Sequence, residues 1–198
     1  MNNKPVKKHP TLGCCGLDCG LCPRYYTEGS SRCPGCCGPD FYSKNPGCGF
    51  ITCCVKKNNL EVCGECNGYP CQRFYDWLKK KPYDSFLTHK KIGTNQDFIK
   101  KHSLQVFIEQ QSKRIHILKE MLKDFNDGRS KSFYCISNTL LSIEALEKSI
   151  RDSKKKIKSS NVKDDDFKTK ATILKDFLKK AAEKEHVELK LNKPPHWK

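Results

Sequence analysis

The chain has 198 residues, of which 36% are hydrophobic and 30% charged, and it carries a formal net charge of +16. This length suits one or two domains with a modest core. No stretch approaches the roughly 18 consecutive apolar residues of a transmembrane helix, and the polar, Lys-rich opening residues lack the apolar region of a secretory signal. The composition therefore excludes a membrane-spanning protein and predicts a cytoplasmic one.

Cysteine is the residue type that sets this chain apart. Thirteen of the fourteen cysteines lie in the 58 residues from Cys14 to Cys71, and only Cys135 lies outside. Thirteen thiols cannot all pair with one another, and cysteines of proteins that are not exported normally stay reduced. A secreted disulfide knot is therefore disfavoured, and bound metal is the expected support for this part of the chain.

The composition changes along the chain and predicts a mainly α protein with two domains. Residues 1–13 read as a flexible leader. Residues 14–74 are rich in Gly, Pro and Cys, and they predict a turn-rich metal-binding domain with little regular structure. Residues 75–192 predict a small helical bundle, and residues 193–198 form a tail.

Apolar residues recur at helical spacing in four segments, 74–78, 104–125, 133–150 and 167–181. Each segment predicts an amphipathic helix, and the second is the longest uninterrupted one. Between the third and fourth segments, residues 151–160 read as a basic linker. Near the end, apolar and polar residues alternate over 187–191, which allows one short strand.

The spacing of the cysteines predicts metal ligation. Cys19–Cys22, Cys33–Cys36 and Cys63–Cys66 are three CxxC pairs, and a two-residue spacer lets a tight turn point both sulfurs at one ion. With further cysteines nearby, the expected ligands number ten: Cys15, Cys19, Cys22, Cys33, Cys36, Cys48, Cys53, Cys63, Cys66 and Cys71. Eight thiols would fill two four-cysteine sites, so at least two metal sites are expected. The doublet neighbours Cys14, Cys37 and Cys54 are either spare or complete a third site.

Zinc is the expected metal, because closed sites of four thiolates are its usual structural sites. A [4Fe-4S] cluster is the alternative, since it uses the same ligands. The spacing Cys15-x₃-Cys19-x₂-Cys22 matches the cluster motif of radical-SAM enzymes. The helical pattern downstream disagrees with the barrel of those enzymes, so radical-SAM chemistry is disfavoured.

These motifs resemble those of a known family. Cys15–Cys22 (CGLDCGLC), Cys33–Cys36, Cys48–Cys53 and Cys63–Cys71 (CGECNGYPC) are similar to the cysteine-rich "domain of unknown function 3795" family over residues of about 13–75. Downstream, Gly128–Cys135 (GRSKSFYC) is similar to a second block found in such proteins. The resemblance implies a prokaryotic metal-binding protein whose ligands are the ten thiols named above. It implies no assigned reaction.

The block at 128–135 also predicts two local sites. An anion is expected at the start of a helix, held by Arg129, Ser130, Lys131 and Ser132, because free backbone N–H groups there favour negative charge. The bland alternative is a turn with solvated basic residues. Cys135 is a candidate reactive thiol, since helix N-termini lower thiol pKa values. An isolated helical cysteine is more often a small buried hydrophobic residue, which is the alternative interpretation.

The basic charge predicts an acidic partner. Residues 1–75 hold 9 basic and 5 acidic side chains, whereas residues 76–198 hold 29 and 17. Nucleic acid is the natural partner for such a surface. The sequence therefore favours a metal-binding adaptor of nucleic acid. A redox or sulfur-handling iron–sulfur protein and a thiol-rich metal store are the alternatives, and no catalytic residue can be assigned.

Overall fold

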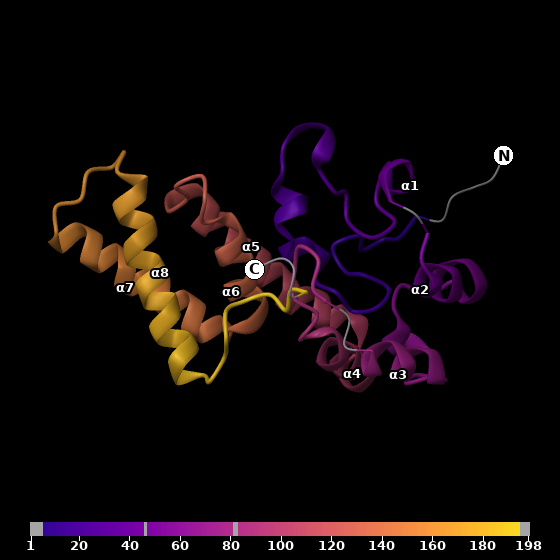
Figure 1. Ribbon diagram of the computed structural model, residues 1–198. Coiled ribbons are helices and arrows are strands. Elements are labelled where there is room, and N and C mark those ends of the chain that lie inside the picture. Colours follow the sequence, from indigo (N-terminus) through magenta and orange to yellow (C-terminus); the bar gives the residue numbers. More distant parts are fainter. Residues whose placement is uncertain (1–5, 46, 81–82, 195–198) are drawn as a thin grey trace. The chain divides into compact units, whose positions relative to one another are not determined.

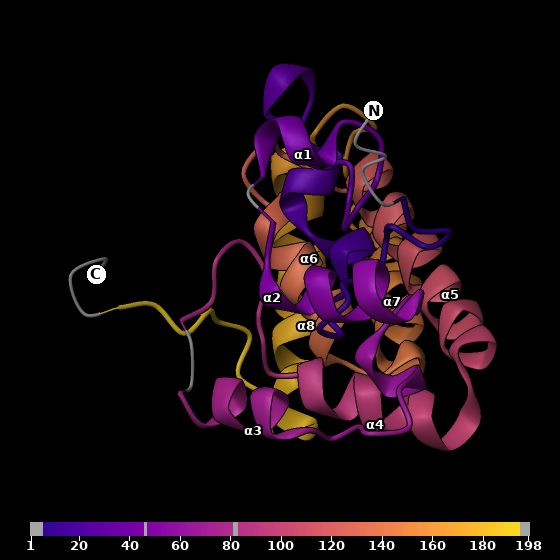
Figure 2. The same cartoon turned by 90° about the vertical axis from the view of Figure 1, so that its right-hand side faces the viewer.

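Figure 1 shows the computed structural model, which describes residues 6–45, 47–80 and 83–194. Helices of all kinds, 3-10 and π-helices included, cover 60% of the described residues, which contain eight α-helices and no strand. Figure 2 shows the same ribbon after a quarter turn. The predicted mainly α class is confirmed, and the short strand allowed over 187–191 is not seen. None of the described helices is long and apolar enough to cross a membrane.

The chain divides into two compact units. The first comprises residues 1–111 together with 192–198, and the second comprises residues 112–191. The division falls inside α5 (Leu104–Asp124), which begins in the first unit and ends in the second. Two helices that follow the cysteine-rich segment therefore belong to the same unit as the cysteines. The predicted domain ranges 14–74 and 75–192 stay a prediction.

The first unit is built mostly from short turns, as the composition predicts. Its 3-10 helices are Cys19–Leu21, Pro23–Tyr26, Gly29–Ser31 and Cys63–Glu65, and a π-helix covers Thr52–Lys57. Its α-helices are the short α1 (Phe41–Lys44) and α2 (Gly49–Ile51), then α3 (Gln72–Lys79) and α4 (Ile92–His102). Such short elements leave most backbone groups to be bonded between loops, so the ties described below hold the unit together.

The start of the described chain is packed rather than free. Within the range read as a flexible leader, Leu12 is 0% exposed and Lys7 only 4% exposed. The backbone N–H groups of Lys8 and His9 donate to the carboxylate of Glu61. Leu12 belongs to an apolar core cluster with Val62, Ile99 and Phe107, whereas residues 1–5 lie outside the described part of the chain.

The second unit is a helical packing built on hydrocarbon side chains. After α5 it contains α6 (Lys131–Leu140), α7 (Ile143–Ser159) and α8 (Phe167–Lys184). The α7 and α8 helices pack against each other (Figure 1). The inward face of α8 includes Leu174 and Leu178, each 0% exposed, at the four-residue spacing that puts side chains on one face.

The predicted helix over 133–150 is interrupted. Leu141 takes an extended conformation, and the Ser142 side chain accepts a hydrogen bond from Ala145 N at 3.1 Å, which starts α7. The basic linker expected at 151–160 was a wrong prediction, because α7 continues to Ser159. Ser149 and Ser153 are small enough to be buried on its inner face, while the lysines point outward and complement the helix C-terminus.

Candidate metal centre

Three buried thiols come together in the first unit. The Sγ atoms of Cys14, Cys36 and Cys37 all lie within 4.8 Å of one another. The Sγ atoms of Cys14 and Cys36 are 3.8 Å apart. A tetrahedral site with metal–sulfur bonds of about 2.3 Å has edges of about 3.8 Å. This trio therefore has the spacing and the donor chemistry to hold a metal ion.

Two further thiols extend the trio. The thiol of Cys54 lies close enough to Cys14 to raise the pKa of Cys14, and the Sγ atoms of Cys54 and Cys63 lie 3.3 Å apart. Each sulfur atom is thus close to the next in the order Cys37, Cys36, Cys14, Cys54 and Cys63, and all five are buried. We call these five thiols the sulfur row. Ile51, Tyr69, Phe74 and Ile92 complete the same core cluster, so sulfur supplies much of the interior of this unit.

Backbone ties between distant segments assemble the sulfur row. Cys36 N donates to Pro10 O at 2.8 Å, and Cys63 N donates to Cys14 O at 3.0 Å. Between the residues of the CxxC pair, Gly35 adopts a φ of +86°, where a Cβ would collide with the Pro10 backbone. Glycine is therefore required at this turn.

Helix α4 fastens two of the cysteine segments. The fully buried side chain of Gln96 donates from Nε2 to Cys14 O at 2.9 Å and accepts from Gly64 N at 2.5 Å. A Cβ on Gly64 would lie 2.8 Å from Gln96 O, so this close approach needs glycine. Asn95 donates to Gly16 O and to the buried carboxylate of Asp18. The amide side chains of α4 thus align the loops that carry Cys14 and Cys63.

The thiols of the sulfur row hold their protons more tightly than ordinary cysteines. The hydrogen bond with Cys14 raises the pKa of Cys36 to about 11, helped by burial. The hydrogen bond with Cys36 and then burial raise the pKa of Cys37. For Cys14, the bond with Cys36 lowers the pKa, but the bond with Cys54 and burial outweigh it. Adjacent buried thiolates would repel one another without a cation between them.

A buried lysine faces the same thiols. Lys7 donates from Nζ to Leu12 O at 2.5 Å and is 4% exposed. Its positive charge acts to lower the pKa values of Cys14, Cys36 and Cys37, opposing their net increase. A buried ammonium is costly unless negative charge lies near it. Lys7 is therefore suited to a centre that carries thiolates, and sequence analysis missed it because a single lysine in a lysine-rich segment gives no signal.

The donor set fits a soft cation. Thiolates bind zinc, copper(I) and iron–sulfur clusters in preference to hard cations such as magnesium. A bound cation would replace the thiol protons that burial retains, so binding would release protons. Cys14, Cys36 and Cys37 would hold the ion, and Cys54 is the thiol nearest to them along the sulfur row.

The structure places the ten thiols predicted as ligands in surroundings that differ in burial. Cys36 and Cys63 belong to the sulfur row, joined by Cys14, Cys37 and Cys54, which the spacing marks as spare or as part of a third site. Six others are half-buried, namely Cys15, Cys19, Cys22, Cys33, Cys53 and Cys66. Cys48 and Cys71 are exposed. The assignment of all ten thiols as ligands stays a prediction.

Some of the remaining thiols lie near the sulfur row or near each other. Burial raises the pKa of Cys15 to about 12, and the neighbouring Cys36 and Cys48 add to the increase. Burial also raises the pKa of Cys19, with contributions from Cys36 and Cys15. The thiols of Cys15 and Cys19 are therefore close enough to Cys36 for negative charge on Cys36 to oppose their deprotonation.

The predicted anion site at 128–135 already holds a carboxylate. Asp127 Oδ1 accepts from Arg129 N at 3.0 Å and from Ser130 Oγ at 2.5 Å. The hydrogen bond from Ser130 lowers the pKa of Asp127 to about 2, helped by the hydrogen bond from Arg129 N and by the nearby positive charge of Lys175. An external anion would meet this negative charge at the start of α6. Binding through Arg129, Ser130, Lys131 and Ser132 stays a prediction.

The candidate reactive thiol Cys135 lies inside the second unit. It is 0% exposed and is flanked on α6 by the equally buried Tyr134 and Ile136. A reagent in solution cannot reach this sulfur in the folded state. The position is that of a small core residue.

Comparisons with known proteins leave the chain without assigned relatives: no family model, no curated protein and no solved structure matches it. The similarity to the "domain of unknown function 3795" family therefore stays an expectation from the cysteine motifs. The sulfur row and the positive charge of the chain are the two features that bear on its function.

Proposed function

We propose that this protein binds a thiolate-held metal ion, zinc in the first instance, and uses the shaped domain to contact an acidic partner. The observation that carries the metal proposal is the buried trio of Cys14, Cys36 and Cys37. Buried thiols so close together gain no strong hydrogen bonds from one another, whereas a bound divalent cation would neutralise their thiolates. Structural zinc of this type supplies roughly 10–16 kcal/mol of apparent binding energy to folding.

Anaerobic purification with elemental analysis and an absorption spectrum tests the metal. Zinc in fixed stoichiometry in a colourless protein supports the proposal. A brown protein that contains iron and inorganic sulfide replaces zinc by the iron–sulfur alternative, with a redox or sulfur-handling role. A well-folded protein that contains neither metal overturns metal binding altogether. Cys135→Ala is the matched control, because it removes a buried thiol outside the sulfur row and should keep the full metal content.

Nucleic acid is the acidic partner that we propose. The formal net charge of +16 supports it, because cationic side chains that contact phosphates release condensed counterions from the nucleic acid. Affinity for a single-stranded RNA and for a DNA duplex should fall steeply between low and moderate salt. An affinity that stays level across the salt series, or no binding at low salt, overturns this partner while leaving the metal proposal intact.

A further inference from the structure

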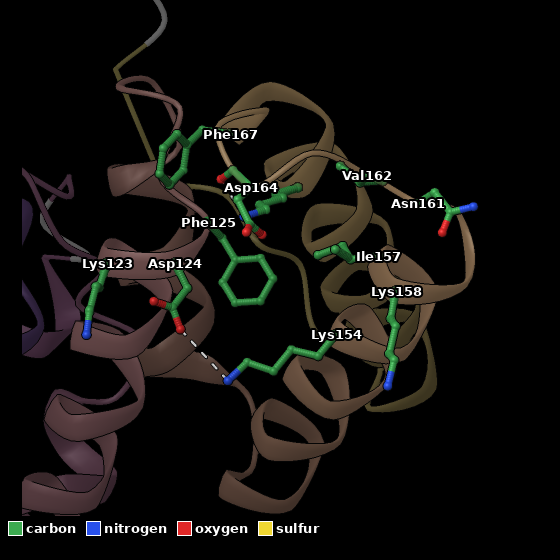
Figure 3. Close-up of a pocket in the computed structure, with 11 residues that line it drawn as sticks. Lys123, Asp124, Phe125, Lys154, Ile157, Lys158, Asn161, Val162, Asp164 and Phe167 are labelled. Carbon is green, nitrogen blue, oxygen red and sulfur yellow. Dashed lines mark hydrogen bonds and ion pairs between the residues drawn. The ribbon is translucent and has the colours of Figure 1, made fainter.

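The second unit contains a cavity of about 660 Å³ that the cysteine chemistry does not use. Figure 3 shows its walls, which come from the end of α5, the second half of α7 and the start of α8. Its volume falls within the range of about 300–1,000 Å³ that is usual for small-molecule sites. The cavity lies within one compact unit, so its shape does not depend on the other.

Four apolar side chains form one part of the lining of this cavity, and charged or polar side chains form the rest. The ring of Phe125, which is 1% exposed, lies at its centre in Figure 3, and Ile157 points toward it. Val162 lines another side. Phe167 also lines the cavity, although 40% of this large side chain remains exposed. An apolar ligand in the cavity would cover the aromatic surface that Phe167 otherwise leaves in water.

The same cavity is lined by lysines with two different roles. Lys154 pairs with Glu120 at 2.7 Å and with Asp124 at 3.8 Å. Lys170 donates to Asp164 O at 2.7 Å. These two ammonium groups are therefore already engaged.

Two other lysines keep their charge available. Lys123 and Lys158 line the cavity, and within residues 6–45, 47–80 and 83–194 no carboxylate forms an ion pair with either. Each stands in or near the last turn of a helix, α5 and α7 respectively, where a cation is favoured. Figure 3 shows the two lysines at opposite edges of the cavity, with the paired Asp124 and Lys154 between them, so a small anionic group would contact one of them.

We propose that this cavity binds a small amphipathic anion, an apolar chain or ring that ends in a carboxylate or phosphate. The apolar body would contact Phe125, Ile157 and Phe167, and the anionic end would lie at one edge of the cavity, beside Lys123 or beside Lys158. A neutral hydrophobic ligand would leave both lysines unused, and a small inorganic anion would leave the apolar walls uncovered. This proposed site depends neither on the sulfur row nor on nucleic-acid binding.

Fluorescence titration of the full chain, as purified, with anilinonaphthalene sulfonate tests the site. Lys123→Gln combined with Lys158→Gln should weaken the probe's affinity about fivefold, as the loss of one exposed charge contact at either edge predicts. Phe167→Ala should weaken it as well. The matched control is Lys155→Gln combined with Lys156→Gln, which removes the same charge from exposed positions of α7 outside the cavity. This control should bind the probe as the parent chain does.

Methyl NMR locates the bound probe independently of the variants. The methyl signals of Ile157 and Val162 should shift on titration. If those signals stay fixed, or if the lysine pair and its control weaken binding equally, the proposal is overturned.

Competition then identifies the source of the anion. Displacement by dodecanoate indicates an acyl chain, and displacement by adenosine monophosphate indicates a nucleotide. If neither ligand displaces the probe at millimolar concentration, the cavity does not select amphipathic anions and the proposal is overturned.

Discussion

The two compact units reach a buried interior by different chemistry. In the first, five sulfur atoms, from Cys37 to Cys63, stand in one core cluster with only four large apolar side chains. In the second, Leu118, Met121, Leu146 and Leu174 are each 0% exposed and belong to long helices. Thiols, which can exchange protons for metal, make up a large part of one interior, whereas the other consists mainly of hydrocarbon side chains, which exclude water.

This difference teaches how a short, turn-rich segment can be ordered. Burying a leucine or phenylalanine side chain contributes about 1.5–3 kcal/mol, and the first unit has few long helices to present such residues. A metal bound by several thiolates contributes more than several such side chains. Removal of metal and substitution of core side chains should therefore change the stability of the two units to different extents.

Metal removal should have the largest effect and should be confined to the first unit. A chelator should abolish the hydrogen-exchange protection of the Cys63 amide, which donates to Cys14 O, because the binding energy that orders these loops is lost. The Tyr134 amide, which donates to Ser130 O in the second unit, should stay protected. Equal protection of the Cys63 amide with and without chelator would contradict the proposed metal centre.

Exchange of single cysteines sharpens the comparison. Cys14→Ala removes the central thiol of the sulfur row, so bound metal per chain should fall by at least one ion, as measured by native mass spectrometry. Cys135→Ala should leave the metal count unchanged and cost about 1 kcal/mol of unfolding free energy through lost packing. A full metal complement in the Cys14→Ala variant would remove this thiol from the ligand set.

A large-to-small exchange in the helical unit gives the reverse pattern. Leu174→Ala leaves a cavity between α7 and α8, so the free energy of unfolding of the second unit should fall by about 2–5 kcal/mol. Chemical denaturation followed by circular dichroism measures this loss. Metal content should remain at the parent level, and a parallel loss of metal would show that the two interiors are coupled.

The smallest effect is expected at the turn before α6. Asp127→Asn should cost about 1 kcal/mol at neutral pH, because a charged hydrogen-bond acceptor is lost. The folded protein holds the pKa of Asp127 at about 2, below its ordinary value. The carboxylate's stabilisation is therefore complete above the ordinary pKa and is lost as pH falls through that value toward about 2. Denaturation of both chains across this range should show their stabilities converging in acid, and a constant difference would contradict the assigned role.

The regular helices were the predictable part of the fold. α5 and α8 carry apolar residues such as Leu118 and Leu178 at helical spacing, so periodicity alone identifies them. The break between α6 and α7 was not predictable, because Leu141 continues the apolar pattern while its backbone leaves the helix. α4 escaped detection because a polar residue, Gln96, occupies the middle of its buried face.

The candidate site was predictable only in kind. Cysteine spacing indicates metal chemistry, because adjacent turns place sulfurs locally. The grouping of Cys14 with Cys36 and Cys54 depends on hydrogen bonds between segments about twenty or more residues apart, such as that from Cys63 N to Cys14 O. No local pattern encodes those ties. The doublet neighbours were undervalued for this reason.

The buried Lys7 gives the opening segment a part in the chemistry of the sulfurs. Its fixed positive charge would offset one unit of the negative charge that thiolates bring to a bound cation. Replacing the ammonium with an uncharged side chain would leave the donor atoms in place but make their joint deprotonation harder. Lys7, which precedes the first cysteine, would thus balance part of the charge of the thiolates. Proteolytic removal of this segment would weaken metal binding while leaving every cysteine in place.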